Sequence, residues 1–196
     1  MTAVTGGASL LERSTSSGLS LRGRTVPAFI AIEGPIGVGK TTLARKIAET
    51  FEYDLLLEEA EMNPFLERFY QNREQTALAT QLFFLFQRVQ KITDIKQRDM
   101  FESTRVTDFI LEKDPLFARV NLDPAEYALY DKVYEKMHVE APVPDLVIYL
   151  QANPERLLER IGKRGIDAEQ SIDRSYLEQL NEVYSEFFLY YDAAPL

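Results

Sequence analysis

The chain has 196 residues and 45% of them are hydrophobic, which is enough for one α/β domain with a substantial core and too few for two. A formal net charge of −9 argues against a protein that binds long nucleic acids, because binding to a polyanion needs a basic surface. The absence of cysteine excludes disulfides and thiolate metal sites and suits a cytoplasmic protein, and no apolar run approaches the roughly 20 residues that span a membrane.

Residues 1–25 differ in composition from the rest of the chain. They are rich in Ser, Thr and Gly, they carry Arg13, Arg22 and Arg24, and their one acid is Glu12. Such a segment cannot bury enough apolar surface to fold. We therefore predict a disordered N-terminal tail at 1–25 and a single folded domain at 26–196.

The rest of the chain alternates between short apolar runs, typical of buried strands, and longer segments with the apolar spacing of helices. In chain order we expect a strand at 28–33, a helix at 41–51, a strand at 55–57, a long helical region at 64–100, a strand at 105–110, a helix at 124–139, a strand at 145–150 and helices at 154–161 and 173–190. Strands that alternate with helices predict an α/β fold with a parallel sheet flanked by helices.

A phosphate-binding motif lies between the first strand and the first helix. The segment GPIGVGKTT fits the pattern of Gly, four residues, Gly, Lys and Ser or Thr. Its backbone N–H groups can turn toward one anion, and the helix N-terminus adds positive charge. We expect Lys40 to reach the β- and γ-phosphates of ATP and Thr41 to bind Mg²⁺. The motif predicts a P-loop NTPase fold in which the nucleotide is held by Gly34, Gly37, Val38, Gly39, Lys40, Thr41 and Thr42.

From about residue 28 to residue 190 the chain resembles the deoxynucleoside kinases of the bacterial deoxyadenosine/deoxyguanosine kinase type. The matching segments are IAIEGPIGVGKTT, EEAEMNPFLERFY, QLFFLFQR, KDPLFA, PDLVIYLQANPERLLERIGKRG and SYLEQLNEVYSEFF. The FY pair, with a Gln eleven positions later and an Arg seven further on, is typical of this family. The resemblance implies a homodimer with a helical lid, which uses ATP and Mg²⁺ to phosphorylate the 5′-hydroxyl of a deoxynucleoside in nucleotide salvage.

The resemblance also implies roles for residues around the acceptor. Glu58 matches the carboxylate that accepts the hydroxyl proton, and Glu59 is the alternative because a shift of one residue would exchange them. Tyr70 and Glu169 match the pair that binds the 3′-hydroxyl of the sugar. Gln81 matches the amide that pairs with the base, and its donor and acceptor suit purines and pyrimidines alike.

Further cations are expected near the same pocket. Arg88, one or two turns beyond the glutamine, is expected to support the base. The run ERIGKRGID resembles the lid, so Arg160 and Arg164 are expected to stabilise charge in the transition state, with Lys163 assisting. One lid arginine of the family is absent, and Ile166 stands in its place.

The chain departs from the family after the third predicted strand. Most members carry an acid-Arg-Ser triplet there, whereas this chain has TDFILEKD. Asp108 is expected to supply the acid that supports Mg²⁺, and the missing arginine is replaced by Lys113 or Arg105, between which the sequence does not choose. The chain ends at 194–196, where the family begins its last strand and the loop that touches adenine, so we expect either a trimmed chain or a nucleotide pocket that is open on one side.

Two other functions stay open at this point. The altered triplet and short C-terminus suit a nucleotide-binding subunit of low activity that supports a catalytic partner. A nucleoside monophosphate kinase such as thymidylate kinase would use an arginine such as Arg68 or Arg73 for the acceptor phosphate. The single histidine, His138, is expected at the surface or in packing rather than as a base. Aromatic helix faces favour a homodimer formed by helix packing.

Overall fold

Four parallel strands form the central sheet in the computed structural model, which describes residues 27–97, 104–137 and 141–196. They are β1 (Phe29–Glu33), β2 (Asp54–Leu56), β3 (Arg105–Thr107) and β4 (Leu146–Tyr149), in the order β2-β3-β1-β4. Phe29 pairs with Arg105 and Ile30 with Leu146, so the carboxyl ends of the strands share one edge. The predicted tail and His138 lie outside the described residues.

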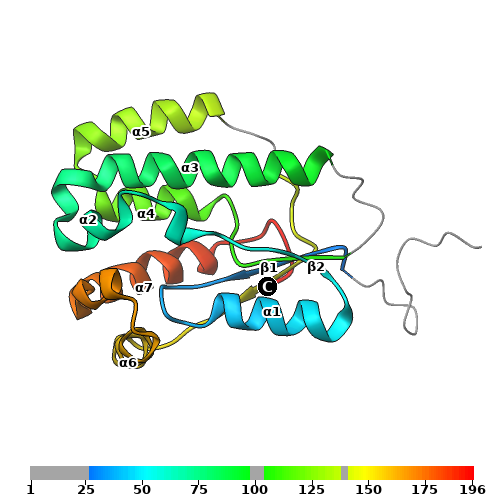
Figure 1. Cartoon of the computed structure of the whole chain (residues 1–196). Helices are drawn as coiled ribbons and strands as arrows, with labels where there is room; N and C mark the ends of the chain where they lie inside the picture. Colours follow the sequence, from blue (N-terminus) through cyan, green and yellow to red (C-terminus); the bar gives the residue numbers. More distant parts are fainter. Residues whose placement is uncertain (1–26, 98–103, 138–140) are drawn as a thin grey trace, which may run out of the picture.

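Helices cover both faces of this sheet (Figure 1). Helix α1 lies on one face, α4 and α7 lie on the other, and α3 and α5 stack beyond α4. This arrangement confirms the predicted α/β fold of the P-loop type. The helices are α1 (Lys40–Phe51), α2 (Leu66–Gln71), α3 (Arg73–Gln97), α4 (Lys113–Asn121), α5 (Pro124–Met137), α6 (Pro154–Arg164) and α7 (Arg174–Leu189), with 3₁₀ turns η1 (Ala60–Met62) and η2 (Asp167–Ser171).

Strand β1 is buried on both faces because its side chains alternate between two hydrophobic clusters. Ile30 and Ile32 pack with Ala44 of α1. Ala31 points the other way and packs with Tyr184 of α7. Burial on both faces explains why this strand reads as a continuous apolar run in the sequence.

The structure differs from the predicted elements in three places. The third strand ends at Thr107 rather than 110, because the Asp108 carboxylate accepts a hydrogen bond from the Glu58 N–H and the chain turns out of the sheet. The long helical region is two helices, separated at Asn72, whose backbone is extended. Helix α4 is not predicted from periodicity, although Pro115 in its first turn is compatible with a helix start.

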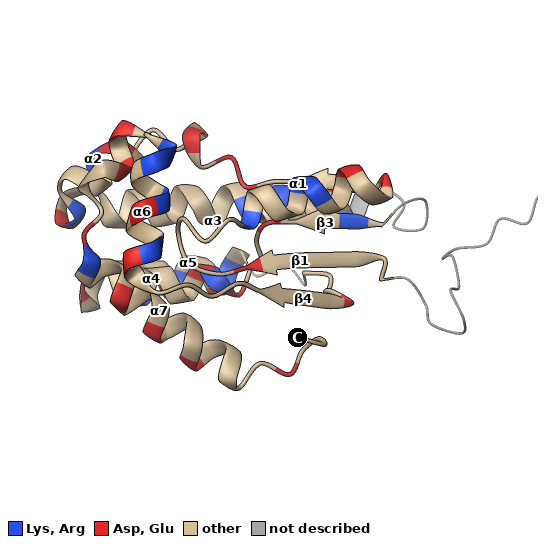
Figure 2. Cartoon of the chain, turned by 90° about the horizontal axis from the view of Figure 1, so that it is seen from below, with Lys and Arg blue, Asp and Glu red and all other residues tan. Residues whose placement is uncertain are grey.

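Charged residues concentrate on the helices and are sparse on the strands (Figure 2). This agrees with a sheet covered on both faces, since an unpaired charge on a strand would be desolvated. Within the described part of the chain, no helix is long and apolar enough to cross a membrane.

Gly37 of the phosphate loop, here called the P-loop (residues 34–42), lies directly against helix α6. Its φ of +79° is unfavourable for other residues. A Cβ atom added there would lie 2.8 Å from Ile161 Cγ1 and 3.2 Å from the Leu157 carbonyl oxygen. Only glycine therefore permits this approach of the loop to the helix.

Gly37→Ala should lower the free energy of unfolding by roughly 1–3 kcal/mol, because it combines a strained backbone with overpacking against α6. Gly162→Ala is the control: Gly162 lies within α6 and an added Cβ meets nothing within 4 Å, so a gain of up to about 1 kcal/mol is expected. Urea unfolding of both variants measures the difference. Equal stability of the two variants would contradict the proposed contact.

Candidate active site

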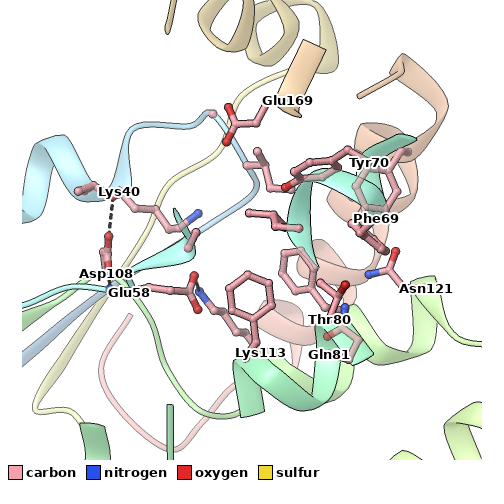
Figure 3. Close-up of a pocket in the computed structure, with 18 of the residues that line it drawn as sticks. Lys40, Glu58, Phe69, Tyr70, Thr80, Gln81, Asp108, Lys113, Asn121 and Glu169 are labelled. Atoms are coloured by element: carbon pink, nitrogen blue, oxygen red, sulfur yellow. Dashed lines mark hydrogen bonds and ion pairs between the residues drawn. The ribbon is translucent and has the colours of Figure 1, made fainter. Parts of the chain in front are cut away.

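The predicted site residues meet at the carboxyl edge of the sheet, around a cavity of about 130 Å³ (Figure 3). Helices α3 and α4 and the P-loop form its walls. The predicted residues that line it are Gly37, Lys40, Thr41, Glu58, Tyr70, Gln81, Arg88, Asp108, Lys113, Arg164 and Glu169. The other predicted residues, which belong to the P-loop or to α6 beside it, are Gly34, Val38, Gly39, Thr42 and Arg160.

Lys40 is the first residue of α1 and extends back over the P-loop. Its Nζ donates to the carbonyl oxygens of Gly34 at 2.7 Å and Pro35 at 3.2 Å. Burial, followed by the charge of Lys113, lowers the pKa of the Lys40 ammonium. An anion in the loop would oppose this shift, so the position suits a cation that meets phosphate.

Thr41 and Asp108 place two oxygen atoms beside the P-loop. Thr41 Oγ1 donates to Asp108 Oδ2 at 2.5 Å, and the second oxygen of Asp108 accepts the Glu58 N–H at 2.7 Å. Mg²⁺ prefers oxygen ligands and takes few of them from the protein when phosphate oxygens are available. This hydroxyl and carboxylate are therefore the groups beside the P-loop that could hold Mg²⁺ together with the phosphates of a nucleotide.

Glu58 is one of the carboxylates that line the cavity. It lies just beyond β2, and its Oε1 accepts from Arg88 Nε at 2.7 Å, while its Oε2 lies 3.0 Å from Lys113 Nζ. Burial raises the pKa of this carboxyl, but Arg88 and Lys113 outweigh burial and lower the pKa to about 2. Glu58 is therefore ionised at neutral pH.

The neighbouring Glu59 points away from the cavity. Its carboxylate is 57% exposed and pairs with Lys91 at 2.8 Å. The strand register thus places Glu58, and not the alternative Glu59, near the P-loop. The role of Glu58 as a base stays a prediction.

Lys113, the first residue of α4, places a cation in the site after the chain leaves β3. Its side chain is 2% exposed, and its Nζ lies 3.0 Å from Glu58 and 3.3 Å from Glu33 Oε1. Arg105 stands at the opposite end of β3, where it pairs with Phe29 at the amino end of the sheet. Of the two predicted replacements for the family arginine, only Lys113 lies in the cavity.

Tyr70 and Glu169 face each other across the upper part of the cavity in Figure 3. Burial, followed by the nearby Tyr176 and Glu169, raises the pKa of Tyr70 well above its usual value, so its phenol stays protonated. Glu169 pairs with Arg164. The site therefore offers a hydroxyl donor beside a carboxylate acceptor, which is suitable for binding a hydroxyl of a sugar.

Gln81 lies at the end of the cavity far from Lys40 (Figure 3). It is 2% exposed, and its Oε1 has no hydrogen-bond partner among the described residues. Arg88, two turns later on α3, points to Glu58 and Asp114 instead. Gln81 is thus available to a ligand, whereas Arg88 holds the Glu58 carboxylate in place instead of pointing to the base end of the cavity.

The predicted lid residues differ in position. Arg160 donates to the Val38 carbonyl oxygen at 2.7 Å and so holds α6 to the P-loop. Arg164 contributes to the cavity through its pair with Glu169. Lys163 is 75% exposed and pairs with Glu159 on the surface of α6, so it does not line the cavity.

Three site residues are missing from the sequence-based prediction. Glu33 is fully buried and accepts from the Tyr184 hydroxyl at 2.8 Å. Asp114 is fully buried and accepts from Tyr130 at 2.7 Å and from Arg88. Asn121, the last residue of α4, lines the cavity. The KD pair in KDPLFA hints at Asp114, but no local pattern indicates the other two.

Comparisons with known proteins place most of the chain in one family. The model of the deoxynucleoside kinase family matches residues 30–196. The chain is 38% identical over 157 residues to the deoxyguanosine kinase of Bacillus subtilis (strain 168), covering 80% of this chain and 76% of that protein. It is 32% identical over 178 residues to the deoxyadenosine/deoxycytidine kinase of the same organism, covering 86% and 80%.

The fold is also similar to a solved structure. The deoxyadenosine kinase from M. mycoides with bound dATP superimposes with a TM-score of 0.74 at 30% identity, covering 84% of this chain and 90% of that one. The structure of the same enzyme with bound dCTP gives a TM-score of 0.73 at 30% identity, covering 82% and 83%.

The fold and the site together define a P-loop phosphotransfer enzyme. The chain belongs to the deoxynucleoside kinase family, whose members transfer a phosphate group from a nucleotide to a hydroxyl of a deoxynucleoside. Relatives that are themselves kinases do not favour the alternatives of a supporting subunit or a nucleoside monophosphate kinase.

Glu58→Gln is expected to lower kcat by roughly 10²- to 10⁴-fold, because an amide cannot accept the hydroxyl proton. Since the pKa of Glu58 is about 2, the parent enzyme should show no acid limb from this carboxylate between about pH 5 and pH 8. Steady-state kinetics across this range measure both effects. Glu59→Gln is the matched control and should retain activity within about twofold, since Glu59 is exposed on the outer side.

Full activity of Glu58→Gln would show that the base assignment is wrong. The stability of the Glu58→Gln variant gives an independent test of the lowered pKa of Glu58. The folded pKa of about 2 is below the ordinary 4.5, so ionised Glu58 stabilises the fold above pH 4.5, and this contribution is lost as the pH falls from 4.5 toward 2. The stability difference between parent and variant should therefore shrink on acidification.

Lys113→Met should lower kcat/KM by roughly 10²- to 10³-fold, because one cation beside the reacting groups is removed. Arg105→Met should change it less than about threefold, since Arg105 lies at the far end of the sheet. Circular dichroism checks folding, because the loss of Lys113 leaves Glu33 and Glu58 with fewer partners. A larger loss in Arg105→Met would reverse the assignment.

Proposed function

We propose that this protein transfers the γ-phosphoryl group of Mg²⁺-ATP to the 5′-hydroxyl of a purine 2′-deoxynucleoside, in nucleotide salvage. The observation that carries the proposal is that Glu58 lines one cavity together with the P-loop lysine, with Tyr70 and Glu169 in its upper part and with Gln81 at its far end (Figure 3). A deoxyguanosine kinase and deoxyadenosine kinases among its relatives support a purine substrate.

Glu58 would accept the 5′-hydroxyl proton while it orients that oxygen toward the phosphorus. Its low pKa makes it a weak base. This is compatible with phosphoryl transfer, whose loose transition state requires little charge on the attacking oxygen and depends mainly on positioning. Arg88 and Lys113 each bind one oxygen of the Glu58 carboxylate, so the carboxylate would face the substrate in a single orientation.

The phosphates of ATP would be held by the P-loop amides and Lys40, with Arg160 and Arg164 next to them. Thr41 and Asp108 would hold Mg²⁺, which supplies neutralisation of the charge on the phosphates. Because Lys40 and Lys113 repel each other, an anion between them would relieve this repulsion. The two cations are therefore suited to opposite sides of the transferred group.

Tyr70 and Glu169 would bind the 3′-hydroxyl of the sugar, the phenol as a donor and the carboxylate as an acceptor. Gln81 would pair with the base, because its unpartnered Oε1 faces the same cavity. The deoxyribose then lies between Glu58 and the base, with its 5′-carbon toward the P-loop.

We also propose that residues 26–196 are the kinase domain, and that it forms a homodimer in the cytoplasm. Phe86 on α3 and Leu129 on α5 are 52% and 51% exposed, and these two helices pack side by side in Figure 1. Exposed large apolar side chains on neighbouring helices are typical of subunit contacts. The absence of cysteine is compatible with a reducing compartment.

The test is phosphorylation of each of the four deoxynucleosides with Mg²⁺-ATP. We expect product from the purine deoxynucleosides, and loss of at least about 10²-fold in kcat/KM in Lys40→Ala. Lys46→Ala is the control, because Lys46 is exposed on the same helix and away from the cavity. Product only from deoxynucleoside monophosphates, or none from any nucleoside, would refute the proposal.

A further inference from the structure

The side chain of Asn121 has an unusual environment for an amide. Both its Oδ1 and its Nδ2 are buried, and neither has a hydrogen-bond partner among the described residues. The side chain lines the same cavity as Gln81, whose Oε1 is also buried without a partner there. Figure 3 shows Asn121 and Gln81 at the end opposite Lys40 and Asp108. Buried amides normally satisfy both groups, so an unpartnered one that lines a binding cavity indicates a ligand contact.

The packing of α3 against α4 explains why the two amides lie at the same end of the cavity. Arg88 of α3 pairs with Asp114 of α4, and the two helices run in opposite directions (Figure 1). Gln81 lies seven residues before Arg88, and Asn121 lies seven residues after Asp114. Seven residues make two turns, or about 10.5 Å, and return to the same helix face. The helix pair therefore presents two cross-helix pairs of side chains, one beside Glu58 and one at the far end of the cavity.

One amide cannot satisfy every base edge. The amide of Gln81 matches two adjacent groups, one donor and one acceptor. Guanine presents three groups in a row, which are a carbonyl oxygen, a ring N–H and an exocyclic 2-amino group. In a pyrimidine the third group adjoins the glycosidic nitrogen, whereas in guanine it lies farther from the sugar. A second amide acceptor next to Gln81 is thus complementary to the guanine 2-amino group.

We infer that Asn121 determines base specificity, with its Oδ1 accepting a hydrogen bond from the 2-amino group of a guanine base that Gln81 holds by the other two groups. This inference rests on the proposed function, since it requires that a deoxynucleoside occupies the cavity. It names the substrate as deoxyguanosine and gives Asn121 a role in choosing it.

A structural role is the competing explanation. The Tyr176 hydroxyl lies close enough to the Asn121 amide for that amide to oppose the rise in the Tyr176 pKa that burial causes, although the two groups do not meet the geometry of an ordinary hydrogen bond. The Tyr176 ring is fixed independently, by the Arg73 guanidinium at 3.8 Å from its centre and by Phe69. An Asn121 that only supported this tyrosine would affect every nucleoside equally.

The experiment compares deoxyguanosine with deoxyinosine, which lacks only the 2-amino group, in the parent and in Asn121→Leu. The parent should prefer deoxyguanosine by about tenfold in kcat/KM, the usual effect of one buried hydrogen bond, because deoxyinosine leaves the acceptor Asn121 Oδ1 unpaired. In Asn121→Leu this ratio should fall to about one, because the loss falls mainly on deoxyguanosine. Circular dichroism checks that the variant is folded.

Asn121→Asp is the conservative variant, since it keeps an acceptor oxygen at the same place and should retain most of the preference. An equal loss for both substrates in Asn121→Leu would assign the residue to structure and overturn the inference. A parent that phosphorylates deoxyadenosine and not deoxyguanosine would overturn it while leaving the proposed function intact. A parent that phosphorylates no deoxynucleoside would refute both the inference and the proposed function.

Discussion

A chain of alternating charges, buried at the carboxyl edge of the sheet, is the interaction on which the site depends. Glu33, Lys113, Glu58, Arg88 and Asp114 follow one another in space, each paired with the next of opposite sign. At one end of the series the Tyr184 hydroxyl donates to Glu33, and at the other end the Tyr130 hydroxyl donates to Asp114. A single buried charge costs several kcal/mol, so no member is stable without its neighbours. These ion pairs connect β1, α4, the segment after β2 and α3, and they fix Glu58 relative to the P-loop.

The side chains at the two ends of the cavity are held in different ways. Near the P-loop, side chains are held by ion pairs, and their geometry is set before any ligand arrives. At the far end, Gln81 and Asn121 keep buried amide groups without partners in the described structure. Under the proposed function, the pre-arranged charges would favour the chemical step, and the two amides would discriminate between bases, because a wrong base would leave them unpaired.

What the sequence predicts here depends on whether the relevant contacts are local. The P-loop is read from nine consecutive residues, and its strand and helix are confirmed nearly to the residue. The choice between Glu58 and Glu59, or between Lys113 and Arg105, depends on strand register, which single-sequence reasoning does not fix. Asn121 has no motif around it. Its importance arises from the antiparallel packing of α3 and α4, which no local spacing encodes.

The glycine contact between the P-loop and α6 has a consequence for how the lid operates. With Gly37 lying against Ile161 and Arg160 bound to the Val38 carbonyl, the first two turns of α6 form one rigid unit with the loop. Under the proposed function, any closure over a nucleotide would therefore come from the segment after Gly165, the residue whose left-handed backbone ends the helix. That segment carries Glu169, so binding of the phosphate donor and contact with the sugar would be coupled.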